Sequence, residues 1–86
     1  MYFENGMRLD KFLKVSRIIK RRTVANEACD AGRVSVNGKT ARASYDVKVN
    51  DIIELAFGTK TFKAQVLSVA DVIKKDDAQT LYKIIE

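Results

Sequence analysis

The chain has 86 residues, of which 47% are hydrophobic, and this size fits one small domain with a modest core. No apolar run approaches the roughly 18 residues of a membrane span. No basic segment leads into an apolar one as in a signal peptide, so we expect a cytoplasmic protein. Histidine is absent and Cys29 is the single cysteine, so the sequence predicts no catalytic residue, no metal site, no cofactor and no internal disulfide. We therefore expect a protein that is not an enzyme.

Positive charge is concentrated in the first half of the chain. Residues 1–42 hold ten Lys and Arg against four Asp and Glu, a net charge of +6, whereas residues 43–86 hold six against seven, a net charge of −1. Such asymmetry is typical of a basic footprint for phosphate on one face of a nucleic-acid-binding protein. The alternative is a solvated basic surface that has no specific partner.

The first predicted helix spans residues 8–15, after a start without periodicity. We expect residues 1–7 to be disordered or artificially added, and residues 8–86 to form one domain. On a helical wheel, the apolar and the basic side chains of residues 8–15 lie on opposite sides. The apolar set is Leu9, Phe12 and Leu13, and the basic set is Arg8, Lys11 and Lys14. The basic side therefore faces away from the core.

A short helical turn at residues 16–20 and a second helix at residues 22–31 are predicted next. The second helix would turn inward its small residues, which let another element approach closely. These residues are Ala25, Ala28 and Cys29. Gly32 suits the left-handed position that follows the last turn of a helix, so we expect the second helix to end there.

The sequence period then changes to that of strands. Residues 34–36 and 39–41 flank Asn37-Gly38, the favoured pair for a two-residue type I′ turn, and together they predict a β-hairpin. After an irregular stretch at residues 42–50, the strands of a second predicted hairpin occupy residues 52–57 and 61–70. A short helix near residues 74–80 and a last strand at residues 82–85 complete the prediction. The expected fold class is α+β, with two helices packed on a small antiparallel sheet.

Four short motifs stand in a fixed order along the chain. They are Arg8-Leu9-Asp10-x-Phe12-Leu13, Arg22-x-x-Ala25, Ala31-Gly32-x-Val34-x-Val36-Asn37-Gly38 and Val47-x-x-x-Asp51-x-Ile53. In this order they resemble the RNA-binding domain family first named for ribosomal protein S-four, over about residues 8–57. The resemblance implies a two-helix RNA-binding face, the αL motif, that binds structured RNA mainly through the RNA backbone. Side chains do not read the deep, narrow major groove of A-form RNA, so shape and phosphate contacts should prevail.

Among stand-alone members of that family, the chain resembles the short factor P family of ribosome-associated quality control, which is related to the small heat-shock ribosome-binding proteins. Residues 11–17 and 19–23 carry this similarity, together with an end soon after Tyr82. The resemblance implies a monomer that binds obstructed large ribosomal subunits and contacts ribosomal RNA and peptidyl-tRNA. It also implies that the protein supports template-independent alanine tailing of the stalled chain by a partner factor.

The expected RNA-binding residues are cations of the two helices, of their connection and of the segment that follows the hairpin turn. They are Arg8, Lys11, Lys14, Arg17, Lys20, Arg21, Arg22, Lys39 and Arg42. Asp10 is expected to orient neighbouring arginines or to cap the helix locally. The family often has a serine where this chain has Arg21, which adds a cation and leaves the helix cap unidentified, with Thr23 as one candidate.

Two other functions remain open from the residues alone. In the first, the basic face docks an acidic protein, as in a protein–protein module. In the second, the chain is a generic regulatory domain that binds structured RNA. Affinity for bare structured RNA separates RNA binding from protein docking. Binding to a membrane surface is disfavoured, because the basic helix turns its apolar side to the core and has no Trp.

Overall fold

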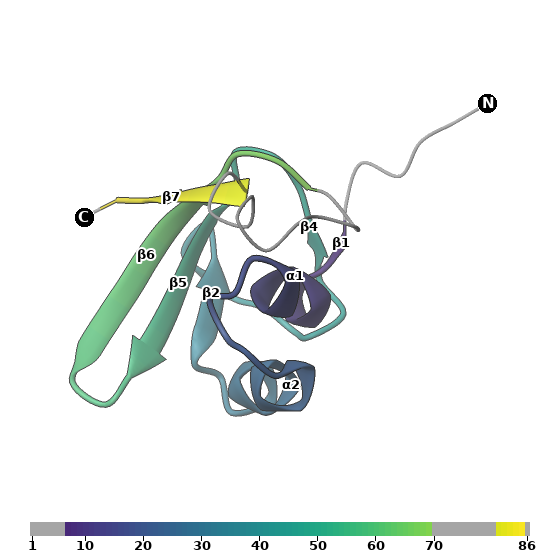
Figure 1. The fold of residues 1–86 in the computed structure, drawn as a ribbon. Coiled ribbons are helices and arrows are strands. Elements are labelled where there is room, and N and C mark those ends of the chain that lie inside the picture. Colours follow the sequence, from purple (N-terminus) through teal and green to yellow (C-terminus); the bar gives the residue numbers. More distant parts are fainter. Residues whose placement is uncertain (1–6, 70–80, 86) are drawn as a thin grey trace.

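An antiparallel sheet of five strands forms one layer of the computed structural model, which describes residues 7–69 and 81–85 (Figure 1). The strands lie in the order β3-β2-β5-β6-β7. Their bounds are Val34–Val36 for β2, Lys39–Thr40 for β3, Ile52–Phe57 for β5, Lys60–Val66 for β6 and Tyr82–Ile84 for β7. Strands β1 (Met7–Arg8) and β4 (Asp46–Val47) pair with each other as a separate two-stranded ribbon.

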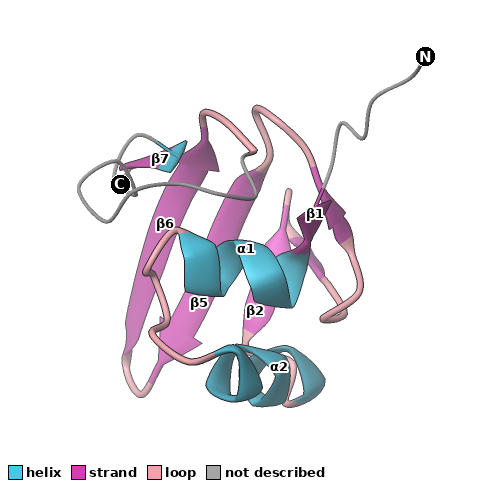
Figure 2. Ribbon diagram, turned by 45° about the vertical axis from the view of Figure 1, so that its right-hand side comes forward, coloured by secondary structure: helices cyan, strands magenta, loops and turns pink. Residues whose placement is uncertain are grey.

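Two helices form the second layer. Helix α1 spans Leu9–Val15 and helix α2 spans Arg22–Asp30, and both lie on the same side of the sheet. In Figure 2, α1 crosses in front of β2 and β5, and α2 lies beside α1. The predicted α+β class, with two helices packed on a small antiparallel sheet, is confirmed.

The core forms where α1 faces the middle of the sheet. Phe12 and Leu13 of α1 are fully buried, as are Val34 of β2 and Ile53 of β5. Ile53 lies opposite Ala64 of β6, so the same sheet face continues across both strands. Burial of a side chain of this size contributes about 1.5–3 kcal/mol to folding. The apolar sector of α1 therefore fixes which way the basic sector of the helix points.

The predicted turns and small-residue contacts are confirmed. Asn37 and Gly38 both have positive φ, at 54° and 85°, as a type I′ turn requires. Gly32 also has a positive φ of 76° directly after Ala31, the C-cap of α2. Ala25 and Cys29 are buried on the inner side of α2. These small side chains let α2 lie close to its neighbours.

The prediction of a helical turn at residues 16–20 is wrong. Helix α1 ends at its C-cap, Ser16, and Arg17 then adopts a left-handed φ of 66°. The N–H of Arg17 donates to the Lys14 carbonyl at 3.1 Å, and the N–H of Ile19 donates to the Leu13 carbonyl at 3.0 Å. These hydrogen bonds close the end of α1, so the following residues turn toward α2 instead of continuing a helix.

The chain enters the fold one residue earlier than predicted. Met7, which the sequence assigns to the disordered or added start, pairs with Val47 and is 8% exposed. Residues 42–50 are correspondingly not irregular throughout, because they contain β4. Two-residue strands are too short to show a period of two in the sequence. The predicted disorder of residues 1–6 lies outside the described residues.

The predicted strand at residues 61–70 is shorter in the structure. Strand β6 ends at Val66, and the N–H groups of Leu67 and Ser68 both donate to the Leu81 carbonyl, at 2.8 and 3.2 Å. The chain thus leaves the regular ladder after Val66. The predicted last strand is confirmed as β7, whereas the predicted helix near residues 74–80 lies outside the described residues. No helix in the described ranges has the length and apolarity to cross a membrane.

Candidate nucleic-acid interface

Asp10, in the first turn of α1, is a buried carboxylate that binds an arginine from the preceding strand. Its side chain is 3% exposed. The Arg8 Nε donates to Asp10 Oδ1 at 3.1 Å, and the Arg8 Nη2 donates to Oδ2 at 3.2 Å. Two parallel hydrogen bonds from one guanidinium fix its plane as well as its position. The Arg8 head group is therefore held at the start of α1.

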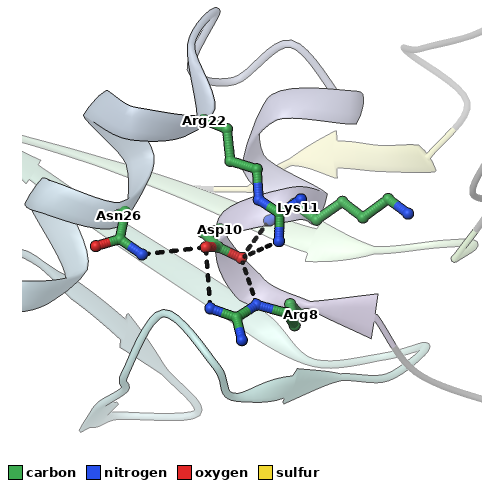
Figure 3. A network of polar contacts seen from close by, with 5 residues as sticks. All are labelled: Arg8, Asp10, Lys11, Arg22 and Asn26. Atoms are coloured by element: carbon green, nitrogen blue, oxygen red, sulfur yellow. Dashed lines mark hydrogen bonds and ion pairs between the residues drawn. The ribbon is translucent and has the colours of Figure 1, made fainter.

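The same carboxylate reaches across to helix α2 (Figure 3). Arg22 Nη2 lies 3.5 Å from Asp10 Oδ1, and the Asn26 side-chain amide donates to Oδ2 at 3.2 Å. Arg22 and Asn26 are four residues apart, so they share one face of α2. Asp10 thus ties the two helices together and brings two guanidinium groups to one carboxylate, which confirms its expected role of orienting arginines.

The electrostatics of Asp10 follow from these contacts. Burial disfavours the charged carboxylate, but hydrogen bonds from Arg8 and Asn26, the charge of Arg22 and the Lys11 backbone N–H outweigh it and lower the Asp10 pKa from 3.8 to about 2. The hydrogen bond from Arg8 and the charge of Asp10 raise the pKa of Arg8 in return. The site holds two cations around one anion and keeps a net positive charge.

Both arginines remain accessible while bound to Asp10. The Arg8 side chain is 49% exposed and the Arg22 side chain is 47% exposed. A guanidinium has five N–H donors, so each arginine keeps donors for a further ligand. Paired planar guanidiniums match the oxygens of a phosphate. The geometry at Asp10 therefore suits binding to a nucleic-acid backbone.

Four of the remaining predicted cations of the helix pair lie on exposed positions of α1, of the connection and of the start of α2. Lys14 lies on α1, Arg17 and Lys20 lie in the connection, and Arg21 is the N-cap residue of α2, and all four are exposed. Their side chains make no hydrogen bond and no ion pair with the residues that the structure describes. The Lys11 side chain is half-buried and runs away from Asp10 (Figure 3).

Two lysines outside the helix pair differ in this respect. Lys63 Nζ lies 3.1 Å from Glu54 Oε2, and Lys48 Nζ lies 3.9 Å from Asp46 Oδ2. Neighbouring carboxylates thus offset part of the charge there. Around α1 and α2, by contrast, positive charge remains in excess for an anionic partner.

Thr23, the candidate cap for α2, does not cap the helix. Arg21 occupies the N-cap position and its side chain makes no capping hydrogen bond, while Thr23 lies inside the helix. A serine or threonine cap typically contributes about 1 kcal/mol. Helix α2 gives up that contribution and places an additional cation at its positive end.

A second carboxylate, Asp51, holds the hairpin that carries the last predicted cations. The Asn37 side-chain amide donates to Asp51 Oδ1 at 3.0 Å, and the Tyr45 hydroxyl donates to Oδ2 at 3.1 Å. The Lys48 N–H also donates to Oδ2, at 2.9 Å, and Asn37 Oδ1 accepts from the Ile52 N–H at 2.9 Å. Burial of the Tyr45 hydroxyl and its hydrogen bond to Asp51 raise the Tyr45 pKa. The turn between β2 and β3 is thereby fixed to the start of β5.

Two adjoining hollows connect the hairpin cations to the helix face. One is lined by Lys39, Arg42 and Tyr45, and the other is lined by Arg42 and Arg8. Arg42 thus borders both hollows. The structure brings Arg8 and Arg22 together at Asp10 and joins Arg8 to Arg42 and Lys39 through the hollows. It places Lys14, Arg17, Lys20 and Arg21 on exposed positions without direct mutual contacts in the described residues.

Sequence reasoning missed the residues that position these cations. Asn26, Tyr45 and the acidic partner Asp51 were not among the predicted site residues, although Asp51 stood within a quoted motif. The spacing of four between Arg22 and Asn26 was the one signal that placed both on the same helix face. The contacts of Tyr45 join segments whose proximity no local pattern encodes.

Comparison with known proteins assigns the chain to a family. Residues 7–53 match the S4 domain model. The "RQC P-site tRNA stabilizing factor" of Streptococcus pneumoniae is 58% identical over 92% of this chain and 90% of its own length. The protein of the same name from Bacillus subtilis is 52% identical over 93% of both chains.

A solved structure gives the same result at the level of the fold. The trimeric structure of Vibrio cholerae Heat Shock Protein 15 superposes with a TM-score of 0.84 at 30% identity, over 93% of this chain and 82% of that one. The matched relatives thus include both the short quality-control type and the heat-shock type that the motifs indicated. The chain belongs to the S4 domain family and, within it, to the family of proteins named RQC P-site tRNA stabilizing factor.

Proposed function

We propose that this chain is an RNA-binding factor of ribosome-associated quality control. In this proposal it binds large ribosomal subunits that carry an obstructed nascent chain, and it contacts both ribosomal RNA and peptidyl-tRNA. The observation that carries the proposal is the pair of guanidiniums, Arg8 and Arg22, which a buried Asp10 holds together on an exposed, cation-rich face. The names of relatives at 58% and 52% identity support the assignment of the RNA as P-site tRNA.

The proposed mechanism is positioning, without a chemical step by this chain. Phosphates of a folded RNA neutralise the exposed cations, release counterions and thereby supply most of the affinity. A tRNA held at several such points loses translational and rotational freedom before each addition to the nascent chain. The partner factor then extends the chain with alanine while the tRNA stays in place. We propose that the chain acts in this way as a cytoplasmic monomer.

The test is the affinity of the purified chain for two forms of the large subunit. One form carries peptidyl-tRNA with an obstructed nascent chain, and the other form is vacant. We expect tighter binding to the obstructed form, because ribosomal RNA and tRNA then both contribute phosphates. Equal affinities would reduce the function to generic binding of structured RNA. Binding to neither form, with capture of an acidic protein instead, would support the protein-docking function.

A further inference from the structure

A hollow of about 560 Å³ lies between α2 and the loop that follows β3, beside the basic face. We call it the α2 hollow. Its lining includes Arg8, Asn26, Asp30, Ala41, Arg42 and Ala43. Sites of 300–1,000 Å³ are the usual size for small ligands, so this hollow has room for a single nucleotide. The position next to Arg8 makes it continuous with the proposed path of the RNA backbone.

One side of the α2 hollow is cationic. Arg8 is oriented by its two hydrogen bonds to Asp10, at 3.1 and 3.2 Å. Arg42 is exposed, and its side chain has no hydrogen bond or ion pair with any residue in the described ranges. Two guanidiniums at the border of one hollow favour an anionic group there, such as a phosphate.

The other side of the α2 hollow offers hydrogen-bond acceptors. The Asn26 amide nitrogen donates to Asp10 Oδ2 at 3.2 Å, and its oxygen consequently points away from Asp10 (Figure 3). Asp30 lies four residues further along α2, on the same face as Asn26. Asp30 and Asn26 both line the hollow.

Asp30 lies at the C-terminal end of α2, where a negative charge does not stabilise the helix. It lies in the last turn of α2, near the negative end of the helix dipole, and that turn contains no basic residue. It is exposed and accepts no hydrogen bond from the residues that the structure describes. A carboxylate with these surroundings is free to bind N–H donors of a ligand.

We propose that the α2 hollow binds one unpaired guanine nucleotide of the RNA, an inference that rests on the proposed RNA-binding function. The phosphate lies against Arg8 and Arg42, and the guanine base lies over Ala41 and Ala43. Guanine carries two adjacent donors, N1–H and the 2-amino group, which pair with the two oxygens of Asp30. Adenine and cytosine offer an amino group without an adjacent N–H, and uracil offers a single N–H. The hollow therefore selects guanine, whereas the rest of the basic face is indifferent to sequence.

The experiment measures binding of the purified chain to RNA hairpins that differ only in one bulged nucleotide. The bulge carries guanosine, inosine, adenosine, cytidine or uridine, and each titration is repeated at several salt concentrations. We expect the guanosine hairpin to bind about tenfold more tightly than the uridine hairpin, as one good bidentate pair supplies. Inosine lacks only the 2-amino group and should lose most of this advantage. The salt dependence should be the same for all five hairpins, because their phosphate contacts are the same.

Asp30→Asn and its control, Glu27→Gln, test the role of the carboxylate. Both variants remove one exposed negative charge from α2, and Glu27 does not line the hollow. Asp30→Asn should bind guanosine and inosine hairpins equally, whereas Glu27→Gln should keep the preference. Five equal affinities for the wild type, with normal salt dependence, would overturn the guanine site and leave the RNA-binding function standing. Absence of salt-dependent binding to every hairpin would overturn both.

Discussion

At the scale of single residues, the fold and the basic face both depend on Asp10, a carboxylate that is buried and charged. Asp10 accepts hydrogen bonds from Arg8 and Asn26 and from the Lys11 backbone N–H, at distances between 2.7 and 3.2 Å. An uncompensated charge in this position would strongly destabilise the fold. The surrounding donors keep the carboxylate ionised and hold the arginines in place, so folding and the shape of the basic face depend on the same atom group.

The first prediction concerns the pH dependence of stability. Asp10 has a folded-state pKa of about 2, below its ordinary value of 3.8. Its charged form therefore stabilises the fold above about pH 4, by roughly 2 kcal/mol, and this contribution is lost as the pH falls toward 2. The Asp10→Asn variant lacks this stabilisation at every pH. Urea unfolding at pH 7 should show the variant to be less stable by about that amount, and the gap should close by pH 2. A gap that stays constant with pH would contradict this role.

A second prediction concerns the left-handed residue Arg17. Its φ of 66° costs a non-glycine residue about 1 kcal/mol, and a glycine relieves that strain while adding freedom to the unfolded chain. Arg17→Gly should consequently unfold within about 1 kcal/mol of the wild type. Its affinity for large subunits should fall, because an exposed cation is lost. Arg17→Val removes the same charge but places a β-branched residue at positive φ, so it should lower the melting temperature clearly. Unchanged subunit affinity in both variants would remove Arg17 from the interface.

At the scale of elements, the interface depends on two helices that bury their apolar sides and leave their cations outside. Phe12 and Leu13 orient α1, while Ala25 and Cys29 let α2 pack closely. The start of α2 departs from the usual pattern, because Arg21 replaces a capping side chain. Exposed charges add little to folding. Arg21, whose side chain caps nothing, is therefore explained better by binding than by stability, whereas Arg22 also contacts Asp10.

The third prediction tests that explanation with Arg21→Ala combined with Arg22→Ala. The double variant should lose several kcal/mol of binding free energy for obstructed large subunits, because counterion release and the guanidinium pair are both reduced. Its free energy of unfolding should fall by only about 1 kcal/mol, because Arg8, Asn26 and the Lys11 N–H still bind Asp10 when Arg22 is removed. Sedimentation assays measure the binding free energy, and thermal unfolding measures the change in stability.

The matched control for that variant is Lys60→Ala combined with Lys83→Ala. Both lysines are exposed and lie on β6 and β7, away from the helix pair, and their removal takes away the same charge. The control should bind obstructed large subunits nearly as well as the wild type. If both double variants were equally weakened, net charge rather than the helix face would govern binding.

The helices and the two hairpins could be predicted because their signals are local. The apolar period of α1, Gly32 after α2 and the Asn37-Gly38 turn each act within a few residues. The ribbon of β1 and β4 could not be predicted, because each strand has only two residues and is defined by its pairing with the other. For the candidate site, the sequence indicated the cations and the role of Asp10. It did not indicate Tyr45 or the hollow beside Arg42, because those contacts arise only when distant segments meet.

At the scale of the whole molecule, the positive charge is concentrated in the first half of the chain. The net charge of +5 comes from the first half of the chain, and the described ranges pair Lys48 and Lys63 with carboxylates while exposing cations around α1 and α2. Asp10 fixes the helix cations, and Asp51 fixes the hairpin that carries Lys39. The result is a basic surface held by two carboxylates, which suits a preformed RNA. A clamp of this kind acts by keeping tRNA in place between successive additions.

The most direct test of this account is the length of alanine tails on a stalled reporter. Cells that lack this chain but retain the tailing factor would be complemented with the wild type, the Arg21→Ala and Arg22→Ala double variant, or the Lys60→Ala and Lys83→Ala control. C-terminal peptide mass spectrometry would measure the tails. The account predicts normal tails with the wild type and the control, and few or no added alanines with the double variant or without the chain. Tails of normal length in cells that lack the chain would contradict it.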